Sequence, residues 1–177
     1  GTEESLPSKS RAIVMMAESV RENQAKKLKK GIMKPFSKLK DNKSDLLEAI
    51  PIITALKTAE RKSEQAGYEF RVPKFDPRNP DNKPNSLEAR VLRELKEQGL
   101  EEKIVQTESS IHYFRPIKLS KECMYCHGDP KGSQDPVGGT KEGWDVGEVH
   151  GAFEIISSLD KAEQRIHAAT LDVVFWT

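Results

Sequence analysis

The segment Cys123-Met124-Tyr125-Cys126-His127 is a C-x-x-C-H pentapeptide that contains both cysteines of the 177-residue chain. Each thiol can form a thioether with a vinyl group of haem, and a histidine directly after the second cysteine can reach the iron as its proximal ligand. Two cysteines placed at random in such a chain fall three residues apart roughly 1% of the time, and a histidine seldom follows. We therefore predict one covalent haem c on Cys123 and Cys126, with His127 as an iron ligand.

Three other uses of a cysteine pair fit the sequence less well. A zinc site needs about four protein ligands, and the chain offers no second cysteine pair, only the scattered His112, His150 and His167. A thioredoxin-type dithiol opens a helix, whereas Gly128 and Pro130 follow the motif here and break one. A structural disulfide would not require the adjacent histidine. Haem attachment is therefore the favoured interpretation.

Size and composition indicate a single domain over residues 1–177. Charged residues make up 32% of the chain but the formal net charge is only +1, so no global field favours nucleic acid as a partner. No apolar run approaches the length of a membrane span, and no secretory signal is present. Because haem attachment of this kind belongs to exported proteins, we expect a periplasmic protein that has lost its leader or membrane anchor.

Helical spacing predicts a long amphipathic helix over residues 10–30, with apolar positions that include Ile13, Ala17 and Val20. Lysines crowd its C-terminal end, where cations suit the helix dipole, and Gly31 is expected to end it. A second helical stretch should begin at Leu46 and be divided by Pro51, which suits the first turn of a new helix.

Alternating apolar and polar residues predict strands at 68–72, 104–107, 111–119 and 148–157. Ser86 is expected to cap one further helix that ends at Gly99, and Ser158 to cap a final one. The C-x-x-C-H motif lies in residues 120–144, a segment rich in glycine and proline that is too long for an ordinary hairpin connection. Helices beside an antiparallel sheet make the expected fold class α+β.

The order of several short segments is specific, although each one alone is weak. The segments are Ala12-Ile13-Val14 to Arg21, Ala66-Gly67-Tyr68 to Pro73, Pro77-Arg78-Asn79-Pro80, Leu87-Glu88-Ala89, Tyr113-Phe114-Arg115-Pro116 and Cys123 to Pro130. In this order they make the chain resemble the periplasmic c-type haem PAS-like sensor domains of bacterial methyl-accepting chemotaxis proteins and sensor kinases.

That resemblance implies a PAS-like antiparallel sheet with helices on one side and the haem-bearing loop before the last strand. It also implies a homodimer in which the N-terminal helix can exchange between protomers, and a membrane-anchored signalling module outside this sequence. Some relatives take a second iron ligand from a cysteine in the Ala49-Ile50 region. This chain has no cysteine there, so its distal side must differ or remain open.

Met33 is the first candidate for the distal ligand, because methionine ligates haem iron and this residue lies at a chain bend between Gly31 and Pro35. Met16, in contrast, matches the apolar face of the first helix. An open or water-occupied position is the second possibility, and His112 or His150 is the third.

Haem propionates require cations, and three arginines flank the segments expected near the haem: Arg71, Arg78 and Arg115. Arg115 is the preferred candidate, since it shares a short segment with the haem loop. Arg71 is retained as a second propionate contact.

Three functions are compatible with such a haem. In a sensor, the oxidation state or a diatomic gas ligand would change the axial contacts of the iron and move a helix. The alternative is a monohaem c-type cytochrome for electron transfer, although such proteins are usually shorter and carry an evident second ligand. A catalytic role would need polar groups in an open distal pocket, which nothing in the sequence places there. We expect a sensor and no enzymatic activity.

Overall fold

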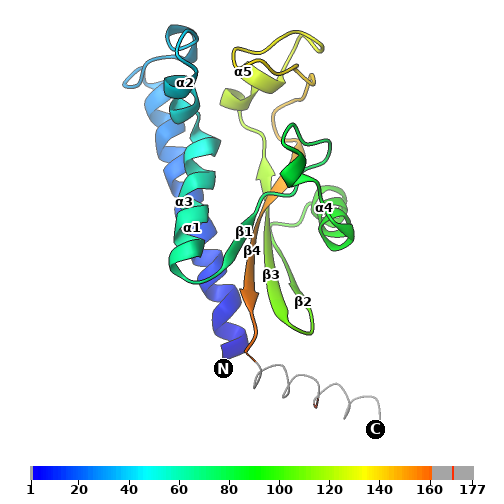
Figure 1. Ribbon diagram of the computed structural model, residues 1–177. Helices are drawn as coiled ribbons and strands as arrows, with labels where there is room; N and C mark the ends of the chain where they lie inside the picture. The colour runs from blue at the N-terminus through cyan, green and yellow to red at the C-terminus, as the bar shows by residue number, and fades with distance from the viewer. Residues whose placement is uncertain (1, 161–168, 170–177) are drawn as a thin grey trace.

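A four-stranded antiparallel sheet in the order β1-β4-β3-β2 organises the chain (Figure 1). The computed structural model describes residues 2–160 and 169. Its strands are β1 (Glu69–Arg71), β2 (Lys103–Gln106), β3 (Ser110–Lys118) and β4 (Val149–Ser158). The predicted α+β class, antiparallel sheet and four strands are confirmed, with each strand boundary shifted by one residue. The helix expected after Ser158 falls almost wholly outside the described residues.

Five α-helices surround this sheet in the part of the chain that the structure describes. They are α1 (Thr2–Lys29), α2 (Lys43–Ala49), α3 (Pro51–Gln65), α4 (Ser86–Gln98) and α5 (Met124–His127). The first helix is longer than the expected 10–30, because it begins at Thr2. It ends as expected at Gly31, which follows the last turn with a φ of 73° that suits glycine.

The break between α2 and α3 follows from Pro51. A proline disfavours the helical conformation of the residue before it, and Ile50 is accordingly extended, with φ −76° and ψ 117°. Pro51 itself occupies the first turn of α3, where its missing N–H costs nothing. The predicted two-part helix is therefore confirmed.

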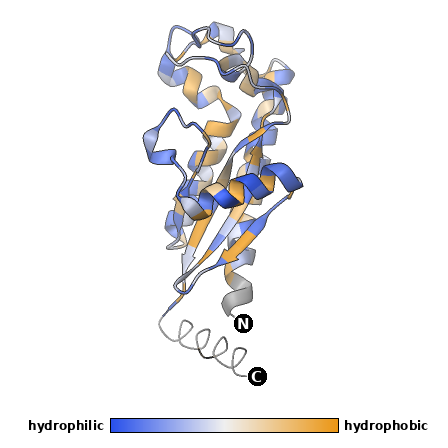
Figure 2. Cartoon of the chain, turned by 90° about the vertical axis from the view of Figure 1, so that its right-hand side faces the viewer, coloured by the Kyte–Doolittle hydropathy of each residue, from blue (hydrophilic) through white to orange (hydrophobic). Residues whose placement is uncertain are grey.

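Helices cover both faces of the sheet, which corrects the expectation of helices on one side. α1 and α3 pack on the face that carries Tyr113 and Phe153, through small or branched residues such as Val14 and Ala55. α4 packs on the opposite face against Phe114 and Ala152. Neighbouring strand residues point to opposite faces, so β3 and β4 supply both cores. Figure 2 views the molecule from the α4 side, with that helix in front of the sheet.

The N-terminus of α4 is capped by Asn85 and not by Ser86, which is the first helical residue. The Asn85 side chain accepts a hydrogen bond from the Glu88 N–H at 2.9 Å, and the Glu88 carboxylate accepts one from the Asn85 N–H at 2.9 Å. This reciprocal capping box contributes about 1 kcal/mol to the helix.

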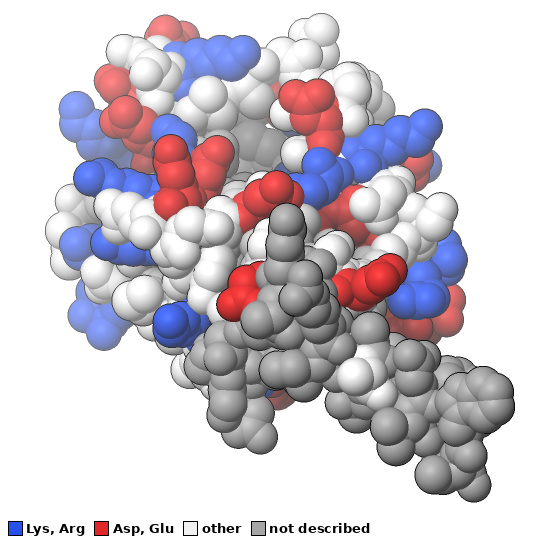
Figure 3. Space-filling model, turned by 60° about the horizontal axis from the view of Figure 1, so that its bottom comes forward, with Lys and Arg blue, Asp and Glu red and all other residues white. Residues whose placement is uncertain are grey.

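The C-x-x-C-H motif lies in the connection between β3 and β4, before the last described strand, as predicted. Its first cysteine is the last residue of a 3₁₀ turn (Lys121–Cys123), and its other four residues form α5. Both lie at the end of the sheet near α2 (Figure 1). No described helix is both long enough and apolar enough to cross a membrane. On the face shown in Figure 3, acidic and basic side chains are interspersed, in keeping with the net charge of +1.

Candidate functional site

A cleft of about 280 Å³ lies between the motif and the α2–α3 region. Cys123, Cys126 and His127 form part of its lining. The facing wall is apolar and is made of five residues from α2, α3 and their junction: Leu47, Ile50, Ile52, Ile53 and Leu56. A concave, mostly apolar site with a few convergent polar groups is typical of a cofactor pocket.

Both cysteines are free and buried. Burial raises the pKa of the Cys126 thiol to about 11, whereas redox-active dithiols have a lowered pKa. Among residues 2–160, no group of three His, Cys, Asp or Glu side chains could hold a metal ion. The raised pKa of Cys126 is therefore opposite to the shift that a reactive dithiol needs.

His127 is oriented by Glu142. The two side chains meet at 2.6 Å between the Nδ1 of His127 and the Oε2 of Glu142. An ionised carboxylate only accepts hydrogen bonds, so Nδ1 carries the proton and Nε2 keeps its lone pair. Burial lowers the pKa of His127, which favours the neutral ring that an iron ligand requires.

Arg78 joins the motif to the loop that follows it. Its guanidinium donates to the carbonyl oxygens of Cys126 and Thr140, each at 3.0 Å, and forms ion pairs with Asp135 and Glu142. Asp135 in turn accepts hydrogen bonds from two loop N–H groups. A side chain at Gly139 would collide with this arrangement, because its Cβ would lie 2.6 Å from the Asp135 carboxylate. Arg78 therefore holds the predicted functional loop together.

Trp144 stacks between two histidines of the cleft. Its ring centroid lies 4.8 Å from that of His127 and 3.9 Å from that of His150, with the planes within 15° of parallel. The backbone N–H of Trp144 also donates to the backbone carbonyl of His127 at 2.9 Å. His150 is held by Glu148, at 2.6 Å from Nε2. Of the histidines considered as distal ligands, only His150 lines the cleft.

Met33 is not brought to the cleft in the described structure. It lies half-buried between α1 and the turn at Phe36–Lys38, and no methionine is among the described lining residues. Ile50, from the region where the resembling domains carry a cysteine, lines the cleft with an apolar side chain instead. The lining outside the motif includes the nitrogen-bearing side chains of His150 and Lys74.

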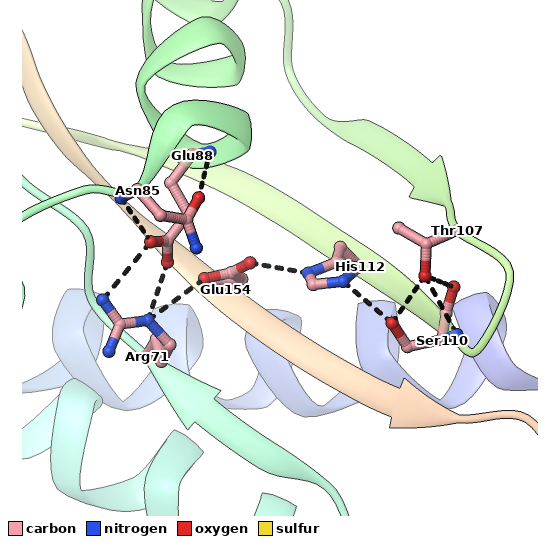
Figure 4. Close-up of polar contacts among 7 residues, drawn as sticks. All are labelled: Arg71, Asn85, Glu88, Thr107, Ser110, His112 and Glu154. Carbon is pink, nitrogen blue, oxygen red and sulfur yellow. Dashed lines mark hydrogen bonds and ion pairs between the residues drawn. The ribbon is translucent and has the colours of Figure 1, made fainter.

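Arg71 and His112 belong to a separate polar network under α4 (Figure 4). The Nε of Arg71 lies 2.7 Å from Glu88 and 3.8 Å from Glu154, because Arg71 on β1 pairs directly with Glu154 on β4. Both ring nitrogens of His112 are engaged, with Glu154 at 2.8 Å and Ser110 at 2.9 Å. The structure therefore does not place either residue at the cleft, and a propionate contact from Arg71 stays a prediction.

Arg115 is also absent from the described lining of the cleft. It lies half-buried on β3, where its charge acts on Glu18 of α1 and on Glu102. The cations that do line the cleft are Lys74 and Arg78. Arg115 shares a strand face with Ile117, which lines the cleft, but it lies two residues farther from the motif, where it acts on Glu18 instead.

Sequence reasoning did not single out Glu142, Trp144 or Lys74. The first two lie within the loop predicted to be functional. An acidic and an aromatic residue close to a C-x-x-C-H motif could have been used to predict them as contacts of His127. Lys74 lies at the start of the proline-rich segment 73–84, and its place in the cleft depends on an isolated bridge to Gly151 of β4.

Fold and site together define a class of small α+β domains in which a single antiparallel sheet presents a C-x-x-C-H loop before its last strand. A family model described as Tll0287-like matches residues 1–158, so the chain belongs to the Tll0287-like family. The chain is similar in structure to a cyanobacterial heme-protein, Tll0287, with a TM-score of 0.67 and 20% sequence identity over 90% of this chain and 98% of that one. No curated protein sequence matches the chain.

Proposed function

We propose that this domain binds one haem c, attached through Cys123 and Cys126, with His127 as the proximal ligand. The observation that carries the proposal is the meeting of the C-x-x-C-H motif with an apolar cleft, in which Glu142 occupies Nδ1 of His127 and leaves Nε2 for iron. Membership of the Tll0287-like family supports it, since the structurally similar Tll0287 is a heme-protein.

The residues present fit a porphyrin in three respects. The α2–α3 wall offers apolar side chains to the ring, and both thiols line the same cleft. Lys74 and Arg78 supply cationic groups for propionates, which replaces Arg71 and Arg115 in that role. Burial lowers the pKa of Lys74, so an anionic partner would stabilise its charged form.

We propose sensing as the purpose of the haem, in a periplasmic domain. The bound group would supply an iron whose oxidation state or diatomic ligand differs between two states. Ile50 and Ile53 provide an apolar wall with no donor to the iron, which favours an open sixth position. That wall is joined to α1, because the Gln24 amide donates to the carbonyls of Glu48 at 3.1 Å and Ala49 at 2.7 Å. A displacement of α2 would thus act directly on the long N-terminal helix.

A homodimer and a membrane-anchored signalling module, both implied by the resemblance to chemotaxis receptors and sensor kinases, complete this proposal. A non-enzymatic role is part of it. Electron transfer is the second candidate. His150 lines the cleft, but Trp144 stacks between it and His127, so a second ligand from His150 would require Trp144 to move.

The test is an optical spectrum of protein matured in a host that assembles c-type cytochromes. Mass spectrometry of the denatured chain should show one added haem. A reduced spectrum that changes on addition of carbon monoxide supports sensing through an open site. A six-coordinate spectrum that ignores carbon monoxide supports electron transfer, and a chain that carries no haem contradicts the whole proposal.

A further inference from the structure

Glu142 lies at the centre of a three-residue chain, Arg78–Glu142–His127. One carboxylate oxygen contacts Nδ1 of His127 at 2.6 Å, and the other forms the ion pair with Arg78. We propose that Glu142 is a positioning residue that sets the reduction potential of the haem, and that Arg78 moderates its effect. This inference rests on the proposed function, because it acts through His127 as the iron ligand.

The sign of the effect follows from charge. A carboxylate that accepts the Nδ1 hydrogen bond makes a ligating histidine more basic, and such charge-assisted bonds are short and strong. Ferric haem carries one more positive charge than ferrous haem, so a negative group beside the proximal ligand favours the oxidised state. Glu142 should therefore lower the reduction potential.

Arg78 should act in the opposite direction. Its guanidinium shares the Glu142 carboxylate with His127, which draws negative charge away from the ring. It is also bound to Asp135 and to the Cys126 carbonyl, so the cation is fixed with respect to the motif. Because only about a quarter of the Glu142 side chain is exposed, solvent screens this pair less than an ion pair at the surface.

The chain offers a matched control in Glu148. This carboxylate holds His150 at the same distance, 2.6 Å, that Glu142 holds His127. The two histidines stack on the same tryptophan, but only His127 follows the second cysteine of the motif. Glu142→Gln and Glu148→Gln thus remove the same charge from carboxylate–histidine contacts of the same length, one at Nδ1 of the proposed ligand and one at Nε2 of the histidine beside it.

The experiment is a potentiometric titration of the haem-loaded wild type, Glu142→Gln, Arg78→Gln and Glu148→Gln. At a fixed solution potential, Glu142→Gln should raise the ferrous-to-ferric ratio about tenfold or more, equivalent to about 59 mV for one electron. Arg78→Gln should lower the ratio, and Glu148→Gln should change it less than about threefold. The iron–histidine stretching band of the ferrous protein should move to lower frequency in Glu142→Gln alone.

Equal shifts in Glu142→Gln and Glu148→Gln, or no shift in either, would overturn the inference while leaving haem binding intact. If Glu142→Gln does not accumulate, Glu142→Asp replaces it, since the shorter acid keeps the charge but reaches the ring less well. Its ratio should then rise above that of the wild type, and an unchanged ratio and stretching band would count against the proposal. A wild type without covalent haem would overturn both the inference and the proposed function.

Discussion

Arg21 of the first helix reaches Cys123 of the motif, with its Nη2 at 3.7 Å from the Sγ atom. The same nitrogen donates to the Lys118 carbonyl at 2.8 Å and to the Ser120 hydroxyl at 3.2 Å. The long N-terminal helix is therefore bonded directly to the start of the motif loop. A change at the motif has a route to α1 that does not pass through the sheet.

Replacing Arg21 with glutamine should destabilise the fold by about 1–3 kcal/mol, because the buried Arg21 side chain loses its hydrogen bonds to a part-buried carbonyl and hydroxyl. Urea denaturation gives the free energy of unfolding. Arg11→Gln is the control, since Arg11 forms a partly exposed ion pair with Glu102 whose loss should cost less than about 1 kcal/mol. Equal losses in the two variants would show that the Arg21 contacts contribute no more than a surface pair.

Cys126→Ala should abolish stable haem attachment, whereas His127→Ala should leave the haem tethered through the thioethers. The reason is that Cys126 forms a covalent bond to the porphyrin edge, whereas His127 binds the iron. Mass spectrometry of the denatured protein reports the tether, and the optical spectrum reports the ligand. An unchanged spectrum in His127→Ala would refute the ligand assignment.

Met33→Ala should leave the reduced spectrum as it is in the wild type, because the structure does not place Met33 in the cleft. Met16→Ala should behave alike, since Met16 is about half exposed. The measurement is the reduced spectrum and the rate of carbon monoxide binding. A high-spin reduced haem that appears only in Met33→Ala would instead identify Met33 as a ligand, supplied by a chain arrangement such as an exchanged helix.

The network under α4 should make stability depend on pH. Burial raises the pKa of Glu154 to about 7, and its neighbour Glu88 adds to this shift. A carboxyl whose folded pKa exceeds its unfolded pKa favours folding fully below the unfolded value, and this contribution is lost as the pH rises through the folded value. The free energy of unfolding should therefore decrease as the pH rises from 4.5, the ordinary pKa of a glutamate, to about 7.

Glu154→Gln should flatten this dependence, because it removes the titrating group and keeps an oxygen that can accept from His112. The slope in the wild type approaches about 1.4 kcal/mol per pH unit where the proton difference is complete. Urea denaturation at several pH values measures it. A slope of the same size in Glu154→Gln would assign the effect to another group.

Local patterns were sufficient to predict most elements of the fold. The local signals include helical spacing, the glycines at positions 31 and 99 and the proline at 51. They act within one turn of the backbone, so their effect does not depend on distant residues. Strand alternation predicted the sheet for the same reason. The Asn85 cap differs from the expected Ser86 by one residue, because the two side chains compete for neighbouring backbone N–H groups.

The sequence by itself determined the C-x-x-C-H motif, its place before the last described strand and the α+β class, since each depends on residues that are close along the chain. Only the tertiary structure decided that α4 covers the second face of the sheet and that Arg78, and not Arg71 or Arg115, joins the motif loop. It also decided that Glu142 orients His127. Such contacts depend on strand register and on the path of a long loop, and neither can be predicted from the spacing of residue types along the sequence.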